Sequence, residues 1–132
     1  MPSNAELLVS AWRAYAEGDI EPLAGRIDPS ATWVDDTRVR GDGVYRCRDG
    51  AAARRRLSRI RATEGWNLEG NAPTEAIEVA PDKVILRLRW QEGPALMDLH
   101  QLYVMREGRN VAINDYWSRD AALAAARQGD TV

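Results

Sequence analysis

The feature that constrains the fold most is a long strand-forming run that a glycine interrupts once. Residues 96–117, LMDLHQLYVMREGRNVAINDYW, are rich in residues that favour β-strands, and the run breaks at Glu107-Gly108. Glycine tolerates the positive φ that a tight hairpin turn demands. We therefore predict a β-hairpin with Glu107 and Gly108 as its loop, so that Arg106 pairs with Arg109.

This turn also predicts which residues of the hairpin lie opposite each other. Counting back from the loop places His100 opposite Asp115 and Asp98 opposite Trp117. Opposite residues project from the same face of a sheet with Cβ atoms about 4.5–5.5 Å apart, which suits a hydrogen bond between a histidine and a carboxylate. A four-residue loop on the same centre would keep the pairing, and a three-residue loop would destroy it.

The rest of the chain predicts helices first and strands afterwards, an α+β order. Side chains at Ser3, Asp19, Asp49 and Ser118 are placed to cap helix starts. The predicted helices run from the Ser3 cap to Gly18, from the Asp19 cap to about Arg26, from Gly50 to about Thr63 and from Arg119 to Arg127. The strands predicted before the hairpin are residues 31–35, 68–80 and 83–91. In the last of these, alternation puts Val84, Leu86, Leu88 and Trp90 on one face.

Composition limits the class of protein. A chain of 132 residues with 45% apolar and 29% charged residues is a single globular domain, 1–132, rather than a disordered or membrane protein. No apolar run approaches the roughly 18–20 residues of a spanning helix, and no signal peptide is recognisable, so we expect a cytoplasmic protein. One histidine and one cysteine, Cys47, argue against a metal site, and a net charge of -2 gives no reason to expect nucleic acid. We expect no cofactor.

Two stretches carry a resemblance to a known family. They are AYAEGDIEPLAGRIDPSATWVDD and LYVMREGRNVAINDYWSRDAAL, and with the order of elements they cover essentially the whole chain. The chain resembles the nuclear transport factor two-like superfamily, in particular its SnoaL-like and ketosteroid-isomerase-like members. The resemblance implies a cone-shaped, curved antiparallel sheet wrapped around an internal pocket and closed by N-terminal helices. Because isomerases, dehydratases, cyclases, epoxide hydrolases and non-enzymes share this scaffold, it leaves the function open.

The resemblance also implies roles for individual residues. Asp35 stands where ketosteroid isomerases have their general base, and His100 stands where they have an oxyanion-hole aspartic acid. Their two tyrosines map to Ala11 and Ser58. Asp115 stands where limonene epoxide hydrolases have a catalytic aspartate, but residues 87–89 read Arg-Leu-Arg where those enzymes have Arg-x-Asp. The motifs of both enzymes are therefore incomplete.

The candidate catalytic residues are Asp35, His100 and Asp115. Asp35 beside Trp33 on an inward face would be a general base, and otherwise a surface residue at the end of an edge strand. His100 would be a proton donor oriented by Asp115, and otherwise half of a structural pair. The candidate substrate-binding residues are Trp12, Tyr15, Trp33, Trp90, Asp98 and Trp117. Asp98 would be nearer the rim, and tryptophans are more often core residues than ligand contacts, although in a cone-shaped pocket they can be both.

Two surfaces suggest partners. Met97, Leu99, Tyr103 and Met105 would lie on the opposite face of the hairpin, and a homodimer is the simplest cover for such an apolar face. A set of arginines could meet a phosphate or a carrier protein, or could form a solvated face. These are Arg46, Arg48, Arg54, Arg55, Arg56, Arg59 and Arg61.

The sequence therefore predicts a cofactor-independent small-molecule enzyme that uses acid–base chemistry in a pocket. Isomerase, polyketide-cyclase and epoxide-hydrolase chemistry all suit this layout. The substrate would be apolar, and aromatic or polycyclic. The alternative is a non-catalytic ligand-binding or dimerisation module of the same fold.

Overall fold

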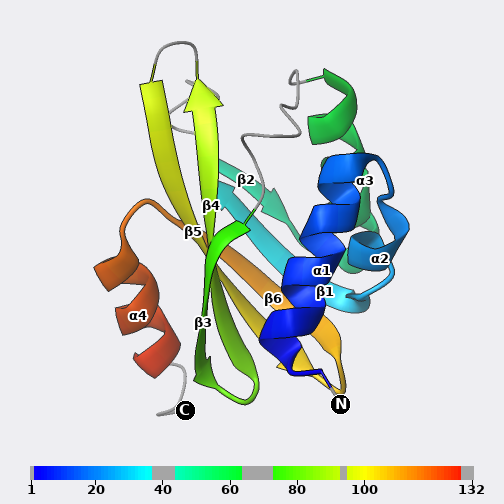
Figure 1. Cartoon of the computed structure of the whole chain (residues 1–132). Coiled ribbons are helices and arrows are strands. Elements are labelled where there is room, and N and C mark those ends of the chain that lie inside the picture. The colour runs from blue at the N-terminus through cyan, green and yellow to red at the C-terminus, as the bar shows by residue number, and fades with distance from the viewer. Residues whose placement is uncertain (1, 37–43, 64–72, 93–94, 129–132) are drawn as a thin grey trace.

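The computed structural model describes residues 2–36, 44–63, 73–92 and 95–128 (Figure 1). Four helices and six strands follow one another along the chain. They are α1 (Asn4–Glu17), α2 (Glu21–Ala24), β1 (Ile27–Asp36), β2 (Val44–Cys47), α3 (Gly50–Thr63), β3 (Pro73–Ala80), β4 (Lys83–Glu92), β5 (Ala95–Arg106), β6 (Arg109–Tyr116) and α4 (Arg119–Gln128). The predicted helices and strands are all present, and the structure adds strand β2, which was not predicted. Residues 68–72 of the predicted 68–80 strand lie outside the described residues.

The strands form one curved sheet in the order β2-β1-β6-β5-β4-β3 (Figure 1). Helices α1, α2 and α3 cover one face, which we call the inner face, and α4 packs against the other, the outer face. This is the expected α+β cone. The sheet is mixed rather than wholly antiparallel, because β1 runs parallel to β6 while the other neighbours are antiparallel.

The predicted caps hold three of the helix starts. Ser3, Asp49 and Ser118 each accept a hydrogen bond from the backbone N–H three residues later, at 3.1, 2.8 and 3.0 Å. Helix α2 is shorter than the predicted 19–26, and Asp19 Oδ1 accepts from the N–H of Glu21 at 3.2 Å. Local capping chemistry therefore fixes where α1, α3 and α4 begin.

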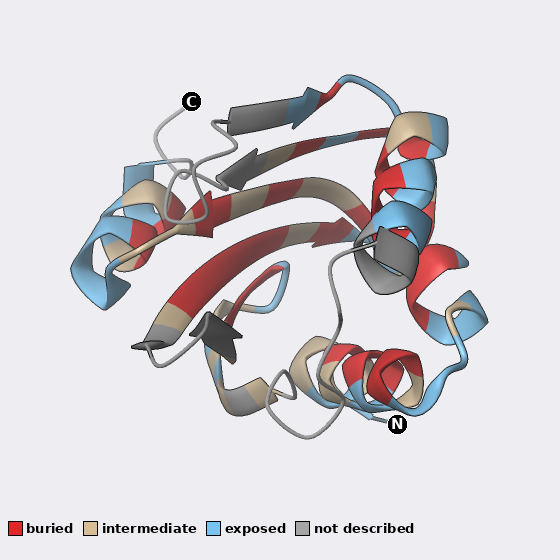
Figure 2. Cartoon of the chain, turned by 90° about the horizontal axis from the view of Figure 1, so that it is seen from above, coloured by how far each residue is buried: buried red, intermediate tan, exposed pale blue. Residues whose placement is uncertain are grey.

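The core lies between the inner face and helices α1 to α3. Val84, Leu86 and Leu88 of β4 are buried there, as their alternation predicts. Seen from above, buried residues line the facing sides of the sheet and helices, and exposed residues lie on the outward sides of the helices (Figure 2).

A second, smaller core holds α4 on the outer face. It consists of Ile85, Leu102, Ala122 and Ala126. Beside it Lys83, which is the chain's one lysine, is buried and donates from Nζ to the backbone oxygen of Ala126 at 2.8 Å. A cation at the C-terminal turn of a helix complements the helix dipole, so Lys83 helps to anchor α4.

The hairpin forms at the predicted turn but with a different register further along. Glu107 and Gly108 have φ of 52° and 77°, and Arg106 pairs with Arg109. Beyond Met105 and its partner Asn110, however, the pairing shifts by one residue, because Val104 lies opposite Ala112. The residue that β6 gains between these two pairs is Val111, so β6 contains a β-bulge.

The bulge makes the predicted pairing of His100 with Asp115 wrong. His100 lies opposite Tyr116, and Asp115 lies opposite Gln101. A slip of one residue moves a side chain to the other face of a sheet. His100 therefore projects from the outer face and Asp115 from the inner face.

The same slip removes the sequence-based argument for a homodimer. Leu99, Tyr103 and Met105 are buried in the inner core, and do not form an exposed outer face. The side chain of Met97 lies outside the described residues. In the described part of the chain, no helix is long and apolar enough to cross a membrane.

Gly50 provides a test of how α3 is seated. A Cβ at this position would lie 2.2 Å from the backbone oxygen of Asp28, which is far inside van der Waals contact. We expect Gly50→Ala to destabilise the protein by roughly 1–3 kcal/mol, because backbone atoms would have to move. Helix propensity alone predicts the opposite sign, a gain of about 0.5–1 kcal/mol. Urea unfolding measures the difference, with the exposed Ala51→Ser as control.

Candidate active site

Four elements bring polar side chains together beneath the helices. Trp12 comes from α1, Trp33 from β1, Gln101 and Tyr103 from β5, and Asp115 from β6. All five are buried, with Asp115 the most exposed at 7%. We call these five residues the inner polar network.

The network is a chain of hydrogen bonds that all point the same way. Trp12 Nε1 donates to the Tyr103 hydroxyl at 2.7 Å, and that hydroxyl donates to Gln101 Oε1 at 2.5 Å. Gln101 Nε2 then donates to Asp115 Oδ1 at 2.9 Å, and Trp33 Nε1 donates to the same oxygen at 3.2 Å. Asp115 is therefore the acceptor on which the network ends.

The protonation of Tyr103 maintains this direction. Burial raises the pKa of the Tyr103 hydroxyl well above its ordinary value of 10.0, although the hydrogen bond from Trp12 acts in the opposite sense. The hydroxyl thus keeps its proton at neutral pH and can donate it to Gln101. An ionised carboxylate only accepts hydrogen bonds, so the polarity of the network suits an ionised Asp115.

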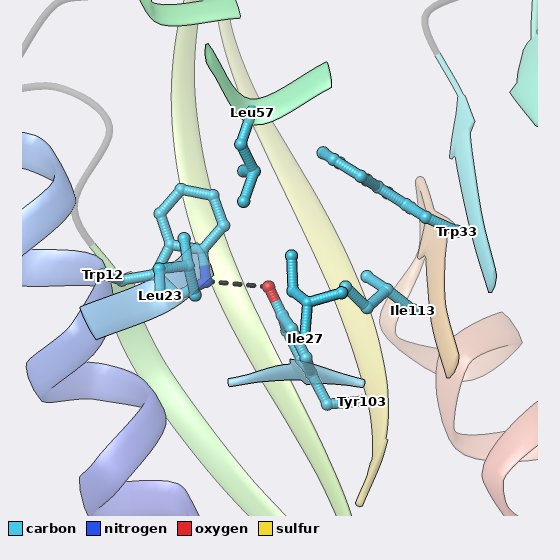
Figure 3. Close-up of a pocket in the computed structure, with 7 residues that line it drawn as sticks. All are labelled: Trp12, Leu23, Ile27, Trp33, Leu57, Tyr103 and Ile113. Atoms are coloured by element: carbon cyan, nitrogen blue, oxygen red, sulfur yellow. Dashed lines mark hydrogen bonds between the residues drawn. The ribbon is translucent and has the colours of Figure 1, made fainter. Parts of the chain in front are cut away.

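An apolar cavity of about 10 Å³ lies next to the network (Figure 3). This is room for about one water molecule. The residues that line it are Trp12, Leu23, Ile27, Trp33, Leu57, Tyr103 and Ile113. Three of these belong to the inner polar network, so the cavity and the network share their aromatic walls.

Tyr15 supports the cavity wall without facing it. Its ring meets that of Trp12 edge to face, with centroids 5.2 Å apart and an interplanar angle of 79°. Its hydroxyl donates to the backbone oxygen of Leu57 at 2.7 Å, which links α1 to α3. Tyr15 therefore positions two lining residues.

The structure separates the predicted catalytic residues. Asp115 is on the inner face and His100 on the outer face, so they do not form the expected pair. The backbone of Asp35 lies in β1 opposite Tyr45, but its side chain lies outside the described residues, as does that of Trp90. Trp117 is half-buried against the inner core.

His100 and Asp98 belong instead to a charged group on the outer face. Arg87 Nη2 lies 2.6 Å from Asp98 Oδ2, and this ion pair holds the pKa of Asp98 below its usual range. Burial lowers the pKa of His100, and Arg87 and Arg119 lower it further, while Asp98 and Glu75 act in the opposite direction. Asp98 is therefore a partner of Arg87, and does not lie on the inner face.

Sequence reasoning missed Gln101 and Tyr103, because it did not foresee the bulge in β6 and so placed the His100 face of β5, rather than the Gln101 face, beside Asp115. It also treated Arg56 as part of a solvated arginine face, yet Arg56 is only 6% exposed. The helical spacing of Arg56 with the buried Ala53 was the available signal. Within the described ranges, no group of three or more His, Cys, Asp or Glu residues could hold a metal ion.

Comparison with known proteins identifies the fold. No protein-family model and no curated protein matches the sequence. TerC, co-crystallised with polyporic acid, is 20% identical with a TM-score of 0.64, over 89% of this chain and 93% of TerC. A proposed polyketide cyclase from Sinorhizobium meliloti is 16% identical with a TM-score of 0.61, over 88% and 95% of the two chains.

A third similar structure is an NTF2-like protein of unknown function from Burkholderia xenovorans LB400. It is 17% identical with a TM-score of 0.65, over 87% of this chain and 82% of its own. The chain therefore has the nuclear transport factor two-like fold, as its resemblance implied.

The Tyr103 hydroxyl offers a test of the network. Tyr103→Phe would leave the Trp12 N–H without its acceptor and Gln101 Oε1 without its donor. We expect a loss of about 1–3 kcal/mol for each buried group left unpaired. Urea unfolding should show this loss, and the half-buried Tyr116→Phe should show much less. Equal losses in the two variants would contradict a stabilising network.

The lowered pKa of His100 predicts how the free energy of unfolding depends on pH. Its pKa is lower in the folded chain than the ordinary 6.5, so the unfolded chain binds the proton more tightly. The contribution of His100 is therefore complete above about pH 6.5 and is lost as pH falls through the folded-state pKa. Between about pH 7.5 and pH 5, wild type should lose more unfolding free energy than His100→Gln. The chain has no second histidine to confuse the comparison.

Proposed function

We propose that the chain is a cofactor-independent enzyme that performs acid–base chemistry on a flat, apolar small molecule, with Asp115 as the proton acceptor. The observation that carries the proposal is the inner polar network, in which every hydrogen bond leads toward one buried carboxylate. Networks of this kind fix the geometry of a catalytic group before the substrate arrives.

The chemistry follows from how Asp115 is held. Trp33 and Gln101 both donate to Oδ1, so they orient the carboxylate without taking part in proton transfer themselves. A carboxylate in a poorly hydrated site can remove a proton from a carbon next to a carbonyl, or from a water molecule. Isomerisation, cyclisation and epoxide opening each begin with such a step.

The aromatic walls support a flat ligand. Trp12, Trp33 and Tyr103 line the cavity, and aromatic rings prefer to pack against other rings (Figure 3). A ring is larger than a cavity of about 10 Å³, so entry requires lining side chains such as Leu57 to move. TerC, which shares the fold, was crystallised with polyporic acid, and the fold thus accommodates a small organic ligand in that protein.

The roles proposed for the other candidates differ. Asp35 remains a predicted second acid–base group, on a strand of the inner wall. His100 has no role in this pocket, because it lies on the outer face, opposite Tyr116. A homodimer remains a prediction as well, to be tested by sedimentation.

A second candidate function is a non-catalytic ligand-binding or dimerisation module. The observation that favours it is the small size of the cavity, together with the internal pairing of the Trp12, Tyr103 and Gln101 side chains. A group that already has its partners can serve structure alone.

Binding of planar phenols separates the two functions. A bound phenolate imitates an enolate, and the negative charge of Asp115 would repel it. We expect tryptophan fluorescence to report saturable binding of 2-naphthol, and Asp115→Asn to bind it at least about tenfold more tightly. The amide keeps an oxygen to accept from Trp33 and Gln101, so the fold should persist.

Asp120→Asn is the matched control, because Asp120 is exposed in the first turn of α4 on the outer side. It should leave the affinity unchanged. Binding that ignores Asp115 would rule this carboxylate out as the reacting group. Absence of binding would favour the non-catalytic module.

A further inference from the structure

One buried side chain that the proposed function leaves unexplained is Asn110. It is 0% exposed, and neither its Nδ2 nor its Oδ1 has a hydrogen-bond partner among the residues that the structure describes. A buried amide without partners is destabilising, and native proteins pair most such groups. We therefore looked to a bound molecule, rather than to another residue, for the hydrogen-bond partner of this amide.

Asn110 and Asp115 both lie on the inner face of β6, on either side of Ile113. Because of the bulge at Val111, the residues of β6 on the inner face are Asn110, Ile113 and Asp115, in that order. Ile113 lines the cavity. Ile27, the partner of Asn110 in β1, lines it too. On β6, an amide and a carboxylate therefore lie before and after Ile113, and the amide is also paired with Ile27, so both are next to residues that line the cavity.

The backbone around Asn110 holds the amide in this position. The N–H of Asn110 donates to the backbone oxygen of Arg26 at 2.7 Å. The Arg26 side chain in turn donates from Nη1 to the backbone oxygen of Gly108, two residues before Asn110, at 3.1 Å. Arg26 therefore holds the backbone at both Gly108 and Asn110.

We propose that Asn110 is a second polar binding site of the pocket, which receives a ligand hydroxyl at the end remote from Asp115. An amide offers one donor group and one acceptor, and a hydroxyl can satisfy both. The ligand class is a planar, multi-ring molecule with an oxygen function at each end. This inference rests on the proposed function, since it assumes that the pocket binds a small molecule.

The contrast with the rest of the pocket supports this assignment. The Trp12 and Tyr103 groups that reach the cavity already bond to each other, and the remaining lining residues are apolar. A ligand hydroxyl would gain little from them. Asn110 can form hydrogen bonds with a ligand without breaking any that the described structure contains.

The test compares two ligands that differ by one hydroxyl. They are para-phenylphenol and its analogue with a second hydroxyl on the far ring. In wild type, tryptophan fluorescence should show the diol binding about tenfold more tightly, the effect of one or two buried hydrogen bonds. Symmetry of the diol alone gives about twofold. In Asn110→Leu, which keeps the volume but not the amide, the ratio should fall to about two.

Asn114→Leu is the matched control, because Asn114 lies on the same strand but opposite Leu102 on the outer face. It should retain the tenfold ratio. A second measurement uses wild type alone, so it does not depend on how the variant folds. The side-chain amide resonances of Asn110 in a nitrogen-15 spectrum should shift on saturation with the diol and stay in place with the single phenol.

The outcomes separate the two proposals. If both ligands bind wild type with a ratio of about two, and the amide resonances ignore the diol, the second site is wrong while the pocket stands. If the Asn110 amide protons instead stay in contact with a long-lived water molecule while the ligand is bound, Asn110 holds water only, and the inference is overturned. If neither ligand binds, the proposed function fails and the second site fails with it.

Discussion

The arrangement of this chain depends on one β-bulge. Val111 adds a residue to β6, and from that point on each β6 residue lies opposite a different β5 residue from the one that simple counting gives, so that Asp115 shares a face with Gln101 and not with His100. Gln101 and Asp115 therefore meet on the inner face, where Asp115 also accepts from Trp33, while His100 lies on the outer face beside Arg87. The meeting of Gln101 with Asp115, and the separation of Asp115 from His100, therefore both depend on one local irregularity.

Most of the fold could be predicted from the sequence, because interactions between residues close together in the chain determine where its helices and turns begin. Ser3, Asp49 and Ser118 cap helices with their own side chains, and Gly108 permits the turn whatever surrounds it. The bulge has no such local origin. It is accompanied by a bond from the N–H of Asn110 to the backbone oxygen of Arg26, a residue of the segment leading into β1 and far away in sequence. Counting residues back from the turn takes no account of that contact. It therefore predicted the turn at Glu107 and Gly108 correctly but the pairing of His100 with Asp115 wrongly.

The inner polar network shows how a carboxylate can be buried in an aromatic core. Burying Asp115 is unfavourable unless its oxygens receive hydrogen bonds, and Trp33 and Gln101 supply two of them. Gln101 is itself held by Tyr103, whose burial raises the hydroxyl pKa and so keeps its proton in place. Trp12 on α1 completes the network by donating to the Tyr103 hydroxyl. Packing and hydrogen bonding are thus coupled, because the rings that fill the core also carry the donors that orient the acid.

The two faces of the sheet treat their carboxylates differently, and this bears on function. Asp98, on the outer face, lies against the guanidinium of Arg87, so its charge is largely neutralised by its partner. Asp115, on the inner face, accepts hydrogen bonds from Trp33 and Gln101, and these two neutral groups orient its carboxylate. A purely structural link between strands is well served by the first arrangement. The second keeps an oriented acceptor in a poorly hydrated interior, which is the state that proton abstraction requires, and this is why we favour acid–base chemistry on the inner face over a purely structural role.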